Sequence, residues 1–265
     1  MLKTDVAPGL TVLYGPPGSG KSSMAITWPP KVVFFDFDLG FDRAHKSDEL
    51  LASGNVVYHK IEIPARSFTT RYEKLVGYKA AWIDFTTKFV EACEDEEVGS
   101  IVVDTCTMEW SLNRDAYLEE LQEQNPNRKQ LLQREYGEPN SRQKIAVAAA
   151  KSYGKHLVWV HHETDMYDIL TIGGQVQLDS NNDPKRIPTG EKTPDGFRYS
   201  LGLADWVLHS RLQFDRKSMQ NGQKPEAKVF AMIEKSARGL HLLGEEIGSF
   251  TFKSLETLIK LGPQK

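Results

Sequence analysis

The chain has 265 residues, of which 40% are hydrophobic and 26% are charged, as is typical of a soluble globular protein. Thirty-three basic residues against 36 acidic ones give a formal net charge of −3, which argues against a surface that coats nucleic acid everywhere but allows a local basic face. Two cysteines, Cys93 and Cys106, are too few for a disulfide framework. With no long apolar run and no signal-peptide pattern, we expect a cytoplasmic protein without membrane contact.

Short apolar runs alternate with helical stretches along the chain, as in a protein built from β-α-β units. This alternation predicts an α/β fold in which helices cover both faces of a mostly parallel sheet. Residues 101–103 and 157–160 are continuously apolar, which is typical of strands buried on both faces. The expected strands are 11–14, 31–35, 56–61, 100–103, 156–160, 206–212 and 228–233, and the clearest helices are 79–94 and 142–153.

A polar segment at about 113–141 is the first interruption of this alternation. Its beginning can continue as a helix to residue 124. The breakers Pro126, Gly137 and Pro139 then predict an extended loop.

A segment rich in glycine and proline, at about 168–200, is the second interruption. Alternating polar and apolar residues at 171–178 predict a hairpin, followed by a turn-rich stretch. Long irregular segments inside a compact domain are usually functional or disordered. Because no linker divides the chain, we expect residues 1–265 to form one domain with two excursions, and residues 249–259 to end it as a short strand or helix.

Residues 15–22 read Gly-Pro-Pro-Gly-Ser-Gly-Lys-Ser and match the phosphate-binding pattern G-x-x-x-x-G-K-[ST] in full. A β-type run precedes the loop and a short helical stretch follows it, which is the context that the motif needs. The glycines let backbone N–H groups face phosphate oxygens, Lys21 reaches the β- and γ-phosphates, and the Ser22 hydroxyl binds Mg²⁺. The expected nucleotide-binding residues, with ATP and Mg²⁺ as ligands, are Gly15, Pro16, Pro17, Gly18, Ser19, Gly20, Lys21, Ser22 and Ser23.

Carboxylates follow two of the expected strands. Asp104 ends an apolar strand in the Walker B form, so it is the expected second Mg²⁺ ligand beside Ser22. The strand after the P-loop helix ends near Asp36 and Asp38, either of which could polarise an attacking water as a general base. Residue types alone do not choose between these two.

Two adjacent histidines, His161 and His162, end the fifth expected strand and precede Glu163. A polar side chain here could touch the γ-phosphate and report its loss. A zinc site is the alternative, but neighbouring residues of a strand point to opposite faces and do not readily bind one ion.

Taken in order, the segments GPPGSGKS, VVFFDFDLGFD, SIVVDT and VWVHHE resemble the motifs of the RecA-like core. The chain is similar in particular to small phage-encoded P-loop ATPases of the RecA-like AAA type, which include single-strand-annealing and recombination proteins. The resemblance extends over about residues 10–260. It implies a RecA-like P-loop NTPase core, a role in DNA recombination or repair, and a location in the host cytoplasm.

The resemblance also assigns roles to single residues. Asp38 stands where RecA-like proteins carry their catalytic glutamate, and His162 stands where the core has a glutamine that senses the γ-phosphate. Lys235 and Arg238 resemble the basic residues that reach into the ATP site of a neighbouring subunit. This last similarity implies a homo-oligomer, either a ring or a filament.

In RecA-like proteins the loops after the Walker B and sensor strands face DNA, and here those loops are the two excursions. The expected partners are therefore single-stranded DNA and, with it, a single-strand-binding protein. Both excursions mix acidic residues with the basic ones, so the charge signal is diluted. The candidate contacts are Arg114, Arg128, Lys129, Arg134, Arg142, Lys144, Lys185, Arg186, Lys192 and Arg198, with Tyr136, Phe197 and Tyr199 for base stacking.

Two alternative functions fit the same P-loop. One is a kinase that transfers phosphate to a small metabolite, for which the second excursion is the nearest candidate for a lid. The other is an assembly module that binds nucleotide without hydrolysing it, which the shorter Asp38 in place of glutamate would favour.

Overall fold

The structure, a computed structural model, describes residues 6–44, 47–65, 74–180, 183–214, 227–237 and 240–261. Its strands are β1 (Leu10–Gly15), β2 (Val32–Asp36), β3 (Val56–Lys60), β4 (Ser100–Asp104), β5 (His156–Ile169), β6 (Thr171–Ile172), β7 (Gln175–Val176), β8 (Arg186–Pro194), β9 (Trp206–Phe214), β10 (Ala227–Ser236) and β11 (Glu246–Gly248). Its α-helices are α1 (Lys21–Ala25), α2 (Ser47–Ala52), α3 (Tyr78–Glu94), α4 (Cys106–Gln124), α5 (Gly137–Ser152), α6 (Ser200–Leu203) and α8 (Phe252–Leu261). The 3-10 turns are η1 (Phe41–Arg43), η2 (Gln133–Tyr136) and η3 (Leu240–Leu242).

One central sheet runs in the order β11-β10-β9-β1-β5-β4-β2-β3. The strands from β9 to β3 pair in parallel, whereas β10 and β11 continue the sheet antiparallel. The P-loop strand β1 and the Walker B strand β4 are separated by β5 alone. The carboxyl ends of β1 and β4 and the middle of β5, at His161 and His162, therefore meet at one edge, where open parallel sheets bind their ligands.

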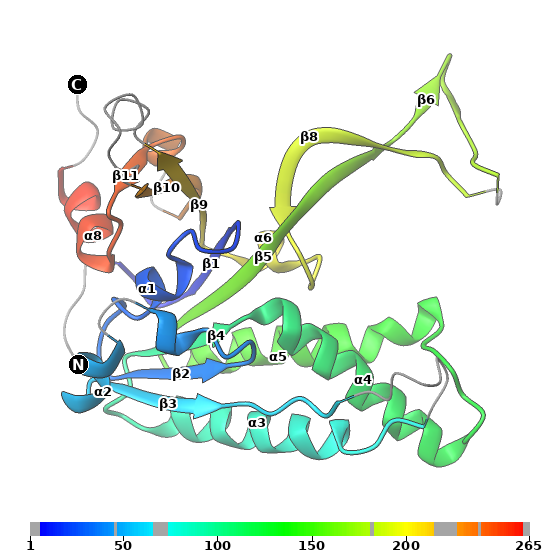
Figure 1. The fold of residues 1–265 in the computed structure, drawn as a ribbon, viewed down its shortest axis with the longest axis horizontal. Helices are drawn as coiled ribbons and strands as arrows, with labels where there is room; N and C mark the ends of the chain where they lie inside the picture. The colour runs from blue at the N-terminus through cyan, green and yellow to red at the C-terminus, as the bar shows by residue number, and fades with distance from the viewer. Residues whose placement is uncertain are drawn as a thin grey trace, which may run out of the picture.

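Helices cover both faces of the sheet, as the alternation predicted (Figure 1). The helices α3, α4 and α5 pack on one face, and α1 and α8 pack on the other. Within β2, Val33 and Phe35 face the first layer, while Val32 and Phe34 face the second. This burial on both faces explains the continuous apolar runs and confirms the α/β fold with a mostly parallel sheet.

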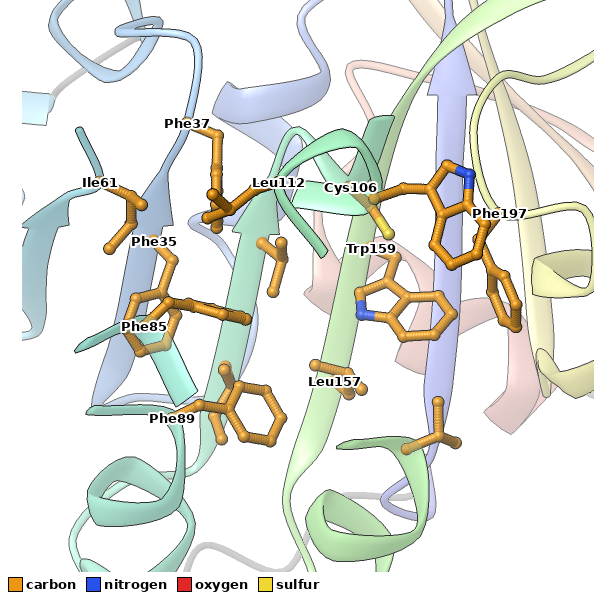
Figure 2. Packing of buried hydrophobic residues seen from close by; sticks show 14 of the residues in the cluster. Phe35, Phe37, Ile61, Phe85, Phe89, Cys106, Leu112, Leu157, Trp159 and Phe197 are labelled. Carbon is orange, nitrogen blue, oxygen red and sulfur yellow. The ribbon is translucent and has the colours of Figure 1, made fainter. Parts of the chain in front are cut away.

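Aromatic rings fill much of the layer under α3 and α4 (Figure 2). Phe85 of α3 meets Phe35 of β2 edge to face, with ring centroids 5.2 Å apart. At the other end of the same layer, Trp159 of β5 packs against Phe197. These contacts hold β2 and β5, whose ends carry candidate site residues, against one helical layer.

The first excursion differs from its expectation. Residues from Gly137 onward form the start of α5 rather than a loop, with Pro139 in its first turn. Proline is tolerated there because the first N–H groups of a helix have no partner within the helix. The predicted helix up to residue 124 is present as the end of α4, and residues 252–261 are helical.

The second excursion is more regular than its composition suggested. β5 continues to Ile169 and pairs antiparallel with β8, so the two strands form an arm that projects from the sheet (Figure 1). The expected hairpin is present as β6 and β7 near the tip, with Gly173 and Gly174 at positive φ. The arm, residues 163–194, carries several exposed apolar side chains: Met166, Tyr167, Ile169, Ile172, Val176, Leu178 and Ile187.

No helix in the described part of the chain is both long enough and apolar enough to cross a membrane.

Candidate functional site

The P-loop connects β1 to α1 in a backbone conformation that needs glycine. Gly18 and Gly20 have φ of 75° and 78°, which L-residues with side chains adopt only with strain. A Cβ atom at Gly15 would lie 2.3 Å from the carbonyl oxygen of Ser210 in β9. The Ser210 hydroxyl also donates to the Ser19 carbonyl at 2.5 Å. The P-loop is therefore held against β9 by a close backbone approach and a hydrogen bond, in a conformation suited to phosphate binding.

Lys21 is the first residue of α1 and is buried. Its Nζ donates to the carbonyl oxygens of Gly15 and Pro16, at 3.0 and 2.8 Å. Burial lowers the pKa of Lys21, and the nearby carboxylates of Asp104, Glu163 and Asp38 oppose that shift. The ammonium group is thus held inside the loop. The negative charge of bound phosphates would favour its charged form, against the effect of burial.

Ser22 and Asp104 meet across the sheet edge, with the serine hydroxyl donating to Asp104 Oδ2 at 2.5 Å. Burial raises the pKa of Asp104 to about 7, and the bond from Ser22 acts against that rise. A hydroxyl and a carboxylate side by side are the hard oxygen donors that Mg²⁺ prefers, and a divalent cation would stabilise the ionised form of Asp104. The two residues therefore fit the expected metal.

Asp36 and Asp38, which residue types did not separate, have different surroundings. Asp36 is fully buried, and its carboxylate accepts hydrogen bonds from the N–H groups of Gly40 and Phe41 and from the Tyr58 hydroxyl. This residue shapes the loop that follows β2. Asp38 is carried on that loop and lines the pocket in front of the P-loop.

Asp38 faces His162 across this pocket, with 3.6 Å between Asp38 Oδ2 and His162 Nε2. The nearby His162 side chain lowers the pKa of Asp38, with a further contribution from Arg43, against the opposing effect of burial. Asp38 Oδ1 accepts no hydrogen bond from the described residues. An ionised carboxylate that lines the pocket has the chemistry of a general base.

The pocket itself has a volume of about 550 Å³ and is lined by the P-loop, the loop after β2, the end of β4 and the middle of β5. It brings together five of the expected residues, Lys21, Ser22, Asp38, Asp104 and His162, whereas Gly15, Pro16 and Lys235 are not among its lining residues. Sequence reasoning missed Arg43, which also lines the pocket from η1. Its proximity in sequence to Asp38 was the signal that could have found it.

His161 and His162 contact different groups, as expected of neighbours on a strand. His161 is buried, its Nδ1 lies 2.7 Å from the Asp195 carbonyl, and burial lowers its pKa to about 4. His162 instead meets Asp38. In the described part of the chain, no three side chains from histidine, cysteine, aspartate and glutamate gather in a way that could hold a metal ion.

A polar cluster on the other side of the P-loop strand was not expected. His209 of β9 lies 3.2 Å from a carboxylate oxygen of Glu163 and 3.2 Å from one of Glu234. Tyr14 of β1 stacks on the His209 ring, with 4.3 Å between centroids, and donates from its hydroxyl to Glu234 at 2.6 Å. The cluster ties the residue before the P-loop to β5 and β10.

Two further expected residues, Lys235 and Arg238, are not among the lining residues of the pocket in the described part of the chain. Lys235, near the end of β10, donates from Nζ to the carbonyl oxygens of Leu201 and Gly202 at 2.9 and 3.4 Å. Arg238 lies outside the described residues. The prediction that Phe197 stacks on bases is wrong, because this side chain is only 1% exposed and packs against Trp110 and Trp159.

Several of the basic side chains expected to meet DNA are paired with acids. Arg128 is bonded to Glu135, Arg142 is bonded to Glu120, and Lys192 lies 2.6 Å from Asp165. Lys185 and Arg186 are exposed on the arm. These two are better placed than the paired cations to contact a polyanion.

Comparison with known protein families matches residues 10–201 to the AAA domain, over more than half of the chain. The chain belongs to the AAA domain family. The matched region begins with β1 and contains the P-loop, Asp38, Asp104 and His162, so it includes the pocket described above. Membership supports a P-loop ATPase family and a nucleotide-binding site. A search of curated proteins found no match to the chain.

Proposed function

We propose that this AAA domain is a RecA-like, Mg²⁺-dependent ATPase that acts on single-stranded DNA in phage recombination or repair, in the cytoplasm of the host. The observation that carries the proposal is the meeting of Lys21, the Ser22–Asp104 pair and the Asp38–His162 pair around one pocket. Phosphate binding, metal binding and water activation each have a candidate group there.

Hydrolysis at this site follows from the positions of the chain's own groups. Lys21 and the N–H groups of the P-loop hold the β- and γ-phosphates, while Ser22 and Asp104 would hold Mg²⁺, which neutralises phosphate charge when bound. The Asp38 carboxylate accepts a proton from water as the water oxygen attacks the γ-phosphorus, and the bond to the bridging oxygen breaks to release ADP and phosphate. Arg43 adds positive charge on the same side of the pocket.

His162 is suited to report whether the γ-phosphate is present. It faces Asp38 at the pocket, and the next residue on its strand, Glu163, begins the arm. A change of partner at His162 when phosphate leaves would act on the base of the arm. The proposal therefore makes the arm the DNA-binding element whose affinity depends on the bound nucleotide.

Substitution of Lys21 tests the ATPase assignment. Because Lys21 supplies the charge inside the loop, Lys21→Ala should reduce ATP hydrolysis to background and weaken ATP binding at least tenfold. The matched control is Lys60→Ala, at a half-exposed lysine in β3 paired with Glu62, which should hydrolyse ATP as the wild type does. The measurement for each protein is the rate of phosphate release from ATP, with and without single-stranded DNA. Wild-type turnover in Lys21→Ala would overturn the assignment, and ATP-dependent phosphorylation of a small acceptor would favour a kinase.

A further inference from the structure

The arm joins the rest of the molecule through two chain segments that lie side by side, at His162 on β5 and at Asp195 after β8. The Asp195 N–H donates to the His162 carbonyl at 2.8 Å, which continues the pairing of β5 with β8 beyond Glu163 and Pro194. We call His162 and Asp195 the arm base. The direction in which the arm projects depends on what holds these two residues.

One side chain contacts both residues of the arm base. The Thr107 hydroxyl accepts from the His162 N–H at 3.1 Å and donates to the Asp195 carbonyl at 3.0 Å. The same carbonyl lies 2.7 Å from Nδ1 of the buried His161, which must carry the proton because a carbonyl oxygen can only accept. Replacing the Thr107 hydroxyl by an apolar group would therefore remove a partner from one backbone group on each side of the arm base.

The backbone after β8 also packs directly against Thr107. Gly196 has φ of 107°, and a Cβ atom there would lie 3.1 Å from the Thr107 Cα. The chain that leaves the arm therefore passes over the first turn of α4 with no side chain between them. Because packed backbones do not interpenetrate, a shift of this helix turn would also displace the arm base.

The first turn of α4 begins at the phosphate pocket. Asp104 ends β4, Thr105 caps α4, and both line the pocket, while Thr107 is the second residue of the helix. Ser22 donates to Asp104, and a cation held by both oxygens would replace this hydrogen bond, because the hydroxyl would then turn a lone pair toward the metal. A change at the Asp104 carboxylate therefore acts on the helix turn that holds the arm.

We infer that Thr107 is a positioning residue that transmits the state of the phosphate pocket to the arm, through the contacts of its hydroxyl with His162 and Asp195. The inference rests on the proposed nucleotide-dependent arm and extends it by a route through α4. Along β5, a change at the His162 side chain reaches one strand of the arm directly. Through Thr107, a change at Asp104 reaches both strands, so that they shift together.

The test compares variants that lack the hydroxyl with one that keeps it. Thr107→Val removes the hydroxyl and retains the side-chain shape, whereas Thr107→Ser keeps the hydroxyl. The matched control is Thr86→Val in α3, where a half-buried threonine donates to the Trp82 carbonyl of its own helix at 2.9 Å. Hydrogen–deuterium exchange gives the rates at residues 162–169 and 186–196, with Mg²⁺ and either ADP or a non-hydrolysable ATP analogue. Calorimetry gives nucleotide affinity, and thermal melting verifies folding. Thr107→Ala replaces Thr107→Val if the valine variant does not fold.

In the wild type we expect exchange near the arm base to be about threefold slower with the ATP analogue than with ADP, because the occupied pocket holds the first turn of α4. In Thr107→Val this ratio should fall to about one, with nucleotide affinity within about threefold of the wild type. Thr107→Ser and Thr86→Val should keep the wild-type ratio.

A wild-type ratio of one would overturn the inference. So would an unchanged ratio in Thr107→Val, and a lower melting temperature beside it would give Thr107 a purely structural role. Either result leaves the ATPase proposal standing as long as the protein hydrolyses ATP. Wild-type protein that binds neither nucleotide would instead contradict the ATPase proposal and, with it, this inference.

Discussion

Asp36, the last residue of β2, and Asp38, in the loop that follows, have different hydrogen-bond partners. Substituting each aspartate should therefore have a different effect on turnover and on stability. Asp36 is fully buried and accepts hydrogen bonds from Gly40, Phe41 and Tyr58, whereas Asp38 Oδ1 has no partner among the described residues. Asp38→Asn should therefore bind ATP nearly as the wild type does but lose turnover at least 100-fold, since a general base acts only in the chemical step. Single-turnover hydrolysis and ATP binding are the measurements.

Asp36→Asn serves as the contrast to Asp38→Asn. Replacing a buried carboxylate that accepts four hydrogen bonds should cost about 2–4 kcal/mol of unfolding free energy, because an amide accepts at only one oxygen and leaves donors unsatisfied. Its melting temperature should fall, while that of Asp38→Asn should not. If Asp36→Asn loses turnover with an unchanged melting temperature and Asp38→Asn keeps turnover, Asp36 is the base.

Burial of Glu109 should make the stability of the protein depend on pH. It lies in α4, accepts from the Gln143 amide at 2.6 Å, and burial raises its pKa to about 8. The unfolded chain releases this proton near its ordinary pKa of 4.5, whereas the folded chain retains it up to about pH 8. Between these values the unfolded state binds fewer protons, so the glutamate makes the protein less stable as the pH rises.

Glu109→Gln removes this titration. The unfolding free energy of the variant relative to the wild type should increase from pH 5 to pH 8, by up to about 1.4 kcal/mol per pH unit. Urea unfolding across this range tests the slope, with Glu62→Gln as an exposed control that should run parallel to the wild type. Parallel curves for Glu109→Gln would show that Glu109 is ionised throughout.

At the scale of elements, sequence patterns correctly predicted the strands and turns whose conformation depends on residues close in the sequence. Apolar runs located the central strands, and the P-loop pattern located a turn whose glycines have positive φ. Residues 137–141 were predicted as loop because glycine and proline break helices, yet both are tolerated at a helix start. β8 was missed because its pairing with β5 depends on partner residues 17 to 31 positions earlier in the sequence, and its own sequence contains Pro188 and Gly190.

The arm leads to a prediction about DNA binding through its exposed basic side chains. If Lys185 and Arg186 contact DNA phosphates, the double variant Lys185→Ala/Arg186→Ala should bind single-stranded DNA more weakly and with a salt slope reduced by about 1.4, since each phosphate contact contributes about 0.7. Fluorescence anisotropy at several salt concentrations gives the slope. Lys192→Ala is the matched control, because that lysine is paired with Asp165 on the same arm. An unchanged slope in the double variant would remove the arm from the DNA-binding surface.

At the scale of the whole molecule, the site joins residues far apart in the sequence. Ser22 meets Asp104, and Asp38 meets His162, because the strand order places β5 between β1 and β4, with β2 beside β4. The motifs predicted that Ser22 and Asp104 lie together, and the resemblance assigned Asp38 and His162 to the same site without predicting their contact. The position of Arg43 in the pocket and the cluster around His209 depend on three-dimensional contacts that no single motif encodes.

The remaining question at this scale is whether one subunit completes the site of another. Lys235 lies near the end of β10 and is bonded to the carbonyls of Leu201 and Gly202, away from its own phosphate pocket. If the Lys235–Arg238 segment reaches a neighbour's γ-phosphate, hydrolysis should rise more steeply than linearly with protein concentration, and Arg238→Ala alone should be inactive. Mixing Lys21→Ala with Arg238→Ala subunits should then restore part of the activity, because one mixed interface combines an intact P-loop with an intact arginine.

The control for this mixture is Lys21→Ala combined with the double variant Lys21→Ala/Arg238→Ala, in which no interface has an intact P-loop. It should stay at background in the same phosphate-release assay. Sedimentation velocity on each mixture shows whether assembly accompanies activity. Linear concentration dependence together with no recovery in the first mixture would mean that each subunit hydrolyses ATP alone. Lys235 would then have only the structural role seen in its contact with α6, where a cation at the carbonyl end of a helix is favourable.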